Sequence, residues 1–288
     1  MFLGAVILFL CSNAVAHSLA HSQRSNQFYR CGITSPTAEE VDSIKALEDI
    51  EKTTRIETSQ HICVDTYVHV VTGNVSEAIT KKQVDDQMNV LNAAFAPHNI
   101  SFKHISTSAI LSEKWGAGGD ELDMKRTLRK GDYSALNLYL VDSARLGSTT
   151  ALGYCTFPTN TSTGSNAFIR DGCVVEAQTV PGGTSAPYNL GGTVIHEVGH
   201  WFSLFHTFQN GCDAPGDRVA DTPAQKEPTS GCPKRKDTCP DSPGDDPIHN
   251  YMDYSTDICY EEFTPGQRLR MHNSWATYRQ RWADGYSN

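Results

Sequence analysis

The spacing of apolar positions predicts alternating strands and helices in the first two thirds of the chain. Strand-like alternation or short apolar runs mark three segments: residues 64–71, 100–110 and 136–141. Between the first two, apolar residues recur at steps of three or four and predict a long amphipathic helix at residues 76–95. Two shorter helices are expected at residues 38–51 and 120–130, and an edge strand bordering a cleft at residues 173–175.

A different pattern follows in the last third. Residues 189–203 carry an apolar stripe at helical spacing, and residues 204–263 are rich in Pro, Gly, Asp and Cys with little periodicity. A last helix begins at Thr264, where the sequence matches a capping box. This order predicts an α+β fold with a cleft between an upper subdomain (residues 62–203) and a lower subdomain (residues 204–288).

The run HEVGHWFSLFH at residues 196–206 carries the most specific chemistry in the sequence. His196 and His200 lie four residues apart, so a helix brings both imidazoles to one face, where they can bind one Zn²⁺. Glu197 lies beside the first ligand and can take a proton from water at the metal. His206 becomes a third ligand if the helix ends before it. Three protein ligands leave one coordination position open, as in catalytic zinc sites.

The composition and the N-terminal residues favour a secreted protein. The 288 residues suffice for one enzyme domain, and the net charge of −9 without any basic run argues against a nucleic-acid partner. Residues 1–20 are interpreted as a signal peptide, because a short apolar run, too short to span a membrane, precedes small-residue cleavage triplets. Residues 21–61 are interpreted as a pro-segment or N-terminal arm ahead of a catalytic domain at residues 62–288. Three sequons agree with secretion: Asn74, Asn99 and Asn160.

Several longer motifs resemble those of one protease family. They are HEVGHWFSLFHTF, GCDAPGDRVADTP, DTCP, DPIHNYMDYS and EFTPGQ. Together they resemble the pappalysin family of metzincin metalloproteases, and above all its secreted fungal members, over residues 64–282. The resemblance implies an upper twisted sheet with helices, a cleft that holds the zinc helix, and a small, disulfide-rich lower subdomain.

The resemblance also implies roles for residues around the zinc motif. Met252 matches the Met-turn, an apolar floor under the zinc ligands, although a Met also packs in any core. Tyr254 matches a tyrosine that approaches the metal or the oxyanion in some metzincins, and a plain buried tyrosine is the alternative. Ser203 replaces the glycine of the family pattern H-E-x-x-H-x-x-G-x-x-H, so we expect a strained or reshaped turn with the ligand intact.

A calcium site is implied in the loop that follows. Its ligands would be the Asp217 carboxylate, the Val219 and Thr222 carbonyls and the Thr222 hydroxyl. The spacing is not that of an EF-hand, and solvated acids in a turn are the alternative. The expected cofactors are one catalytic zinc ion, with calcium as a further candidate.

Eight cysteines remain once Cys11 leaves with the signal peptide, and this even number indicates disulfides in an oxidising compartment. The family pattern implies Cys212–Cys239 and Cys232–Cys259, which leaves Cys155–Cys173 and Cys31–Cys63. Arg30-Cys31-Gly32 has a second interpretation, since Arg-Cys-Gly is the core of the cysteine switch that blocks the zinc in related metzincins. That switch would leave Cys63 as a lone thiol, so the even count favours the Cys31–Cys63 disulfide.

These features predict a secreted zinc endopeptidase that acts on extracellular proteins or peptides, with Glu197 as the general base. The alternative is a catalytically impaired secreted binding protein that keeps the fold, although metal binding alone does not need Glu197. A zinc hydrolase of non-peptide substrates is disfavoured by the third histidine and the Met-turn. We expect a monomer with no membrane partner, and no side chain in the sequence names the preferred substrate.

Overall fold

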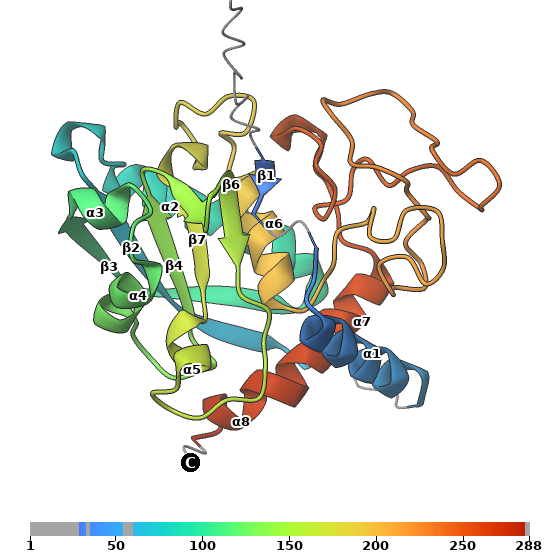
Figure 1. Ribbon diagram of the computed structural model, residues 1–288, viewed down its shortest axis with the longest axis horizontal. Coiled ribbons are helices and arrows are strands. Elements are labelled where there is room, and N and C mark those ends of the chain that lie inside the picture. Colours follow the sequence, from blue (N-terminus) through green and yellow to red (C-terminus); the bar gives the residue numbers. More distant parts are fainter. Residues whose placement is uncertain (1–28, 33–34, 54–59, 286–288) are drawn as a thin grey trace, which may run out of the picture.

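The computed structural model describes residues 29–32, 35–53 and 60–285. Within these residues a sheet of seven strands forms one half of the molecule (Figure 1). Six strands follow the order β1-β6-β7-β4-β2-β3, and β5 pairs with β6 beside this path. The strands are β1 (Tyr29–Cys31), β2 (Ile62–Thr72), β3 (Ile100–Leu111), β4 (Leu136–Val141), β5 (Ala144–Leu146), β6 (Thr149–Cys155) and β7 (Cys173–Glu176).

Helices cover both faces of this sheet. On one face α2 (Lys81–Phe95) and α6 (Gly192–Trp201) bury their apolar residues against β2, β3 and β4 in the main core. On the other face α3 (Glu113–Gly116) and α4 (Glu121–Leu128) cover a smaller cluster. The remaining helices are α1 (Ala38–Thr53), α5 (Asn166–Arg170), α7 (Pro265–Ser274) and α8 (Gln280–Ala283), with a π-helical turn at Trp275–Arg279. The α+β class is confirmed.

β7 is not the edge strand that the sequence predicts for residues 173–175. It lies between β4, to which it is parallel, and β6, to which it is antiparallel. β1 pairs in parallel with the outer edge of β6, and α6 packs against β6. Periodicity does not reveal β6, because residues 151–155 are all buried and show no alternation.

The half of the molecule after α6 has little regular structure, as predicted. Between α6 and α7 a 3₁₀ turn at Asp257–Cys259 is the one helical element, and the chain runs in wide loops (Figure 1). Two disulfides with overlapping spans close these loops, and a third joins β6 to β7. The predicted pairs Cys212–Cys239, Cys232–Cys259 and Cys155–Cys173 are confirmed. The predicted capping box before α7 is also present, between Thr264 and Gln267.

The predicted Cys31–Cys63 disulfide is wrong. Cys31 lies on β1 and Cys63 on β2, and three other strands separate these two. Four strand spacings of about 4.8 Å make roughly 19 Å, whereas bridged Cα atoms lie within about 7 Å of each other. Cys31 is buried and Cys63 is exposed.

Several predictions concern the N-terminal segment and the surface. The signal peptide predicted at residues 1–20 lies outside the described residues. The described part of residues 21–61 forms β1 and α1, and α1 packs against α7.

Among the three sequons Asn74 and Asn160 are exposed and Asn99 is half-buried, so glycosylation stays a prediction. In the part of the chain that the structure describes, no helix has the length and apolarity needed to cross a membrane.

Candidate active site

The zinc motif lies on α6 and on the turn that follows it. All ten residues of α6 are buried, so this helix runs through the middle of the molecule. Before its first turn the Asp257 carboxylate accepts hydrogen bonds from the amides of Leu190 and Gly192, at 2.8 and 3.2 Å. A carboxylate at this end is favoured by the unpaired amides and by the helix dipole.

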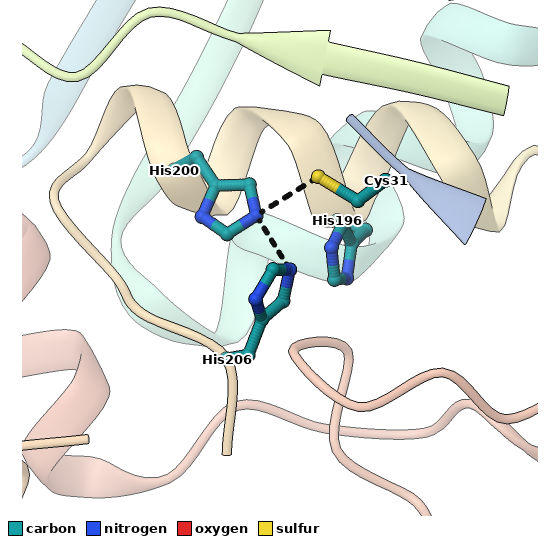
Figure 2. A group of neighbouring side chains, drawn as sticks. All are labelled: Cys31, His196, His200 and His206. Carbon is teal, nitrogen blue, oxygen red and sulfur yellow. Dashed lines mark hydrogen bonds between the residues drawn. The ribbon is translucent and has the colours of Figure 1, made fainter. Parts of the chain in front are cut away.

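Four side chains meet beside α6: Cys31, His196, His200 and His206 (Figure 2). One ligand atom from each lies within 4.8 Å of the other three. Nδ1 of His196 donates to the Tyr251 carbonyl and Nδ1 of His200 donates to the Leu204 carbonyl, both at 2.7 Å. These hydrogen bonds leave the Nε2 lone pairs facing the centre of the group.

The donor set fits a zinc ion. Nε2 of His200 and Nε2 of His206 lie 3.1 Å apart, and Nε2 of His196 is buried without a hydrogen-bond partner among the described residues. Burial lowers the pKa of His200 to about 4 and holds the pKa values of His196 and His206 well below the ordinary value. All three imidazoles are therefore neutral at pH 7, which is the form that binds a metal.

Glu197 is buried next to this group. Its Oε2 lies 3.6 Å from the Cys31 Sγ, and burial raises the pKa of Glu197 to about 8. Gly153 on β6 makes room for it, because a Cβ at that position would lie 2.8 Å from Cγ of Glu197. The carboxyl group is therefore enclosed between α6 and β6.

The turn after α6 carries the one departure from the family pattern. Ser203 adopts φ of 69°, the left-handed conformation for which glycine is usual, as the sequence predicts. Its hydroxyl group lies 2.8 Å from the hydroxyl of Ser274 on α7, and both side chains are buried. This hydrogen bond, which glycine could not make, ties the turn to α7 while His206 still reaches the group of ligands.

The segment around Met252 forms the floor of the site. Met252 is fully buried below α6, and a Cβ at Gly199 would lie 2.3 Å from its Sδ, so this close approach requires glycine. The Tyr254 ring packs edge-to-face on the His206 ring, with centroids 4.9 Å apart, and lies 5.7 Å from the His196 ring. Met252 therefore packs against α6, and Tyr254 lies against His196 and His206.

The N-terminal segment enters the site along β6. Tyr29 and Cys31 of β1 pair with Ala151 and Gly153, and the Cys31 Sγ reaches 3.5 Å from Nε2 of His200. This position agrees with the second interpretation of Cys31, a thiol over the open side of the zinc site.

Arg30, the neighbour of Cys31 in the chain, lies buried among Asp257, Tyr188 and Tyr260, a contact that sequence reasoning missed. We call these three residues the Arg30 pocket. Nη2 of Arg30 lies 3.0 Å from Oδ1 of Asp257, and its guanidinium carbon lies 4.3 and 4.7 Å from the ring centres of Tyr188 and Tyr260. Arg30 and Asp257 are both buried. The Arg-Cys-Gly motif gave the only signal of this contact, since nothing in the sequence marks Asp257 as its partner.

The residues of the predicted calcium site lie together in the loop after His206. Asp217 is buried, and its Oδ1 accepts from the Val219 amide at 3.0 Å while Oδ2 has no partner among the described residues. The Thr222 hydroxyl donates to the Val219 carbonyl at 3.2 Å. Burial raises the pKa of Asp217 to about 7. All three residues line a cavity of about 450 Å³.

Comparisons with known proteins agree with this geometry. The family described as pregnancy-associated plasma protein-A, peptidase family M43, matches residues 125–276. An extracellular metalloprotease of Colletotrichum graminicola is 52% identical over 258 residues, which are 87% of this chain and 91% of that protein. Extracellular metalloprotease 1 of Coccidioides posadasii is 48% identical over 86% of this chain and 90% of its own length.

Solved structures of mirolysin from Tannerella forsythia share the fold. A variant of promirolysin is 27% identical with a TM-score of 0.69, and covers 90% of this chain and 99% of its own. Mature mirolysin with a cleaved peptide is 28% identical with a TM-score of 0.62, and covers 74% of this chain and 91% of its own. The chain described here therefore belongs to the pappalysin family of metzincins and is a zinc metalloendopeptidase.

Proposed function

We propose that this protein is a secreted endopeptidase that hydrolyses peptide bonds of extracellular proteins at a zinc ion held by His196, His200 and His206. One observation carries the proposal: three neutral, buried imidazoles direct Nε2 toward one point, beside the buried Glu197. The extracellular metalloproteases among its relatives support secretion.

Glu197 would move the protons of the reaction. A bound zinc ion supplies Lewis acidity, which lowers the pKa of water and polarises the scissile carbonyl. A bound zinc ion would favour the charged form of Glu197 despite its burial. As a carboxylate, Glu197 would take one proton from the attacking water and deliver a proton to the departing amide nitrogen, which leaves as an amine. Its enclosure by Gly153 and α6 supports this role, because the carboxyl group is held in one place away from bulk water.

Tyr254 would stabilise the oxyanion of the tetrahedral intermediate by donating its hydroxyl proton. Burial is the main reason why the pKa of Tyr254 lies well above the ordinary value, so the phenol keeps the proton that it must donate. Its contact with the His206 ring supports a position within reach of the scissile group.

The N-terminal segment would keep the enzyme latent. The Cys31 Sγ lies among the three histidines and would act as the fourth zinc ligand, while β1 occupies the edge of β6 where an extended peptide could pair. Removal of the segment would open both the fourth coordination position of the zinc and the edge of β6. Residues 21–61 would thus be a pro-segment.

The Arg30 pocket would accept a basic side chain of the substrate. Once the N-terminal segment has left, Asp257 loses the cation that pairs with it, while Tyr188 and Tyr260 still offer two aromatic faces. A lysine or arginine next to the scissile bond restores the ion pair and the cation–π contacts.

Calcium would bind at Asp217, Val219 and Thr222. The unpaired, buried Oδ2 of Asp217 and the raised pKa of this carboxyl group support the proposal, because a divalent cation stabilises the charged form. The ion would stabilise the loop and take no part in the chemistry.

The central test compares the processed wild-type enzyme with Glu197→Gln. The variant should keep about one zinc ion per chain, measured by atomic absorption, and lose about 10²–10⁴-fold in kcat on a quenched peptide. A chelator should abolish wild-type cleavage, and added zinc should restore it. A processed wild-type chain that binds zinc and cleaves neither peptide nor casein would instead favour the catalytically impaired binding protein.

A further inference from the structure

α1 is an acidic amphipathic helix of the N-terminal segment. Its sixteen residues include six acidic and two basic side chains. Its apolar residues recur every third position, and two of them, Ile44 and Leu47, are fully buried. The others, Val41 and Ile50, are partly buried at the margins of the contact.

The surface that receives α1 combines aromatic rings with arginines. Ile44 and Leu47 pack on Phe157, Phe205 and Tyr278, which come from three distant parts of the chain. We call these three rings together with Arg218 and Arg270 the α1-binding face.

Two ion pairs border the apolar contact. Glu48 pairs with Arg218 at 2.8 Å, and Oε2 of Glu51 accepts from Nη2 of Arg270 at 2.9 Å. The Arg270 side chain is fully buried, and its Nη2 also donates to the Arg218 carbonyl. The face therefore recognises two carboxylates three residues apart beside an apolar stripe, which is the pattern of one face of a helix.

This face adjoins the active site. The Phe157 ring lies 5.3 Å from the ring of His200 and 5.5 Å from the ring of Phe205, whose neighbour in the chain is His206. A helix docked here is thus separated from the zinc ligands by a single layer of side chains.

Two surface cavities border the contact with α1. Cavities of about 260 and 340 Å³ lie along it, and each is lined by residues of the N-terminal segment and by Pro215 and Arg218. When the segment leaves, three large rings and two arginines lose their cover, and an exposed apolar patch of this kind marks a site of protein contact.

We propose that the α1-binding face is a second recognition site of the mature enzyme, which binds an acidic amphipathic helix of a substrate protein. α1 occupies this site in the latent chain and shows which chemistry it accepts. The inference rests on the proposed function, because it requires that the N-terminal segment is removed.

The test uses processed wild-type enzyme and three quenched substrates that share one cleavable peptide. The first is the short peptide alone, the second carries the sequence of residues 38–53 through a flexible linker, and the third carries that helix with Ile44→Asp and Leu47→Asp. The second substrate should show a KM about tenfold lower than the others with kcat unchanged, since about 1.4 kcal/mol of extra binding gives a factor of ten.

Two enzyme variants locate the effect. Arg218→Glu should remove the advantage of the second substrate, and a Glu48→Arg change in the tethered helix should restore it. Tyr278→Ala, away from both the zinc ligands and the Asp217 loop, should also remove it. Both variants should cleave the short peptide as the wild type does.

Equal KM values for the second and third substrates, with the short peptide cleaved normally, would overturn the recognition site and leave the proposed function standing. Failure of the processed enzyme to cleave even the short peptide would contradict the proposed function itself.

Discussion

The Cys31 Sγ lies 3.5 Å from Nε2 of His200, although 169 positions separate the two residues in the chain. Because a thiolate at this place would block the open coordination position, we predict that Cys31→Ser activates the unprocessed chain. The intact variant should cleave a short quenched peptide while intact wild type does not, with chain length checked by mass spectrometry.

Cys63→Ser is the matched control, because Cys63 is exposed on β2 and far from the site. It should leave the intact chain as inactive as the wild type. Latency that persists in an intact Cys31→Ser chain would show that β1 alone blocks the cleft and that the thiol is dispensable.

The pocket around Asp257 predicts a preference for a basic residue beside the scissile bond. A charge-assisted hydrogen bond contributes about 1.5–3 kcal/mol, so Asp257→Asn should lower the ratio of kcat/KM for arginine over methionine peptides by about 10- to 100-fold. Asparagine retains an oxygen that can accept from the Leu190 and Gly192 amides, so α6 keeps its N-terminal contacts.

Cleavage of the methionine peptide by this variant serves as the internal control and should change little. A peptide-library profile of wild-type enzyme that shows no enrichment of lysine or arginine on either side of the cut would refute the assignment.

Asp217 predicts a dependence of stability on calcium. A ligand that binds only the folded state at 100 times its Kd adds about 2.7 kcal/mol to the free energy of unfolding. The melting temperature of wild type should therefore rise with millimolar calcium, and Asp217→Ala should remove this rise. Asp237→Ala, an exposed change in the same half of the molecule but outside the cavity around Asp217, should keep it. Identical wild-type melting with calcium and with a calcium-selective chelator, zinc being retained, would exclude the site.

Because His69 is buried, we predict that the free energy of unfolding falls in mild acid. Its Nε2 lies 3.0 Å from Oδ1 of Asn137, an oxygen that also accepts from the Lys130 amide, so Nε2 carries a proton and donates it to this oxygen. Burial lowers the pKa of His69 to about 4. In the unfolded chain the pKa of His69 is about 6.5, so above this pH the ring is neutral in both the folded and the unfolded state. As the pH falls, the unfolded state binds the proton first, and this lowers the free energy of unfolding by about 3 kcal/mol at pH 4.

The variant His69→Gln does not titrate, so its free energy of unfolding should fall less steeply between pH 7 and pH 4 in urea titrations. His61→Gln, an exposed change just before β2, should follow the wild type. Parallel curves for His69→Gln and wild type would rule out His69 as a source of acid sensitivity.

The metal-binding part of the site could be predicted from the sequence because it is local. His196 and His200 share one helical face, and the turn at Ser203 follows from the position that the family pattern gives to glycine. The contacts of the N-terminal segment could not be predicted in this way. Arg30 meets Asp257 across 227 positions, and no periodicity relates a strand of three residues to a loop that distant.

The error over Cys31 has a specific physical cause. Counting cysteines assumes that every thiol of a secreted protein is bonded to another, but the thiol of Cys31 faces His196, His200 and His206 instead. β6 was missed for a different reason: residues 151–155 are all buried and show no alternation, and Gly153, which leaves room for Glu197, looks like a break in an apolar run.

The overlapping spans of Cys212–Cys239 and Cys232–Cys259 have a consequence for the lifetime of the enzyme. A secreted protease is exposed to copies of itself, and its exposed loops are the natural places for self-digestion. Cys232 lies within the first disulfide loop and Cys239 within the second, so every peptide bond from Cys212 to Cys259 is spanned by at least one bridge. A single cut anywhere in this stretch therefore leaves both pieces covalently attached, and the least regular half of the enzyme can be nicked without falling apart.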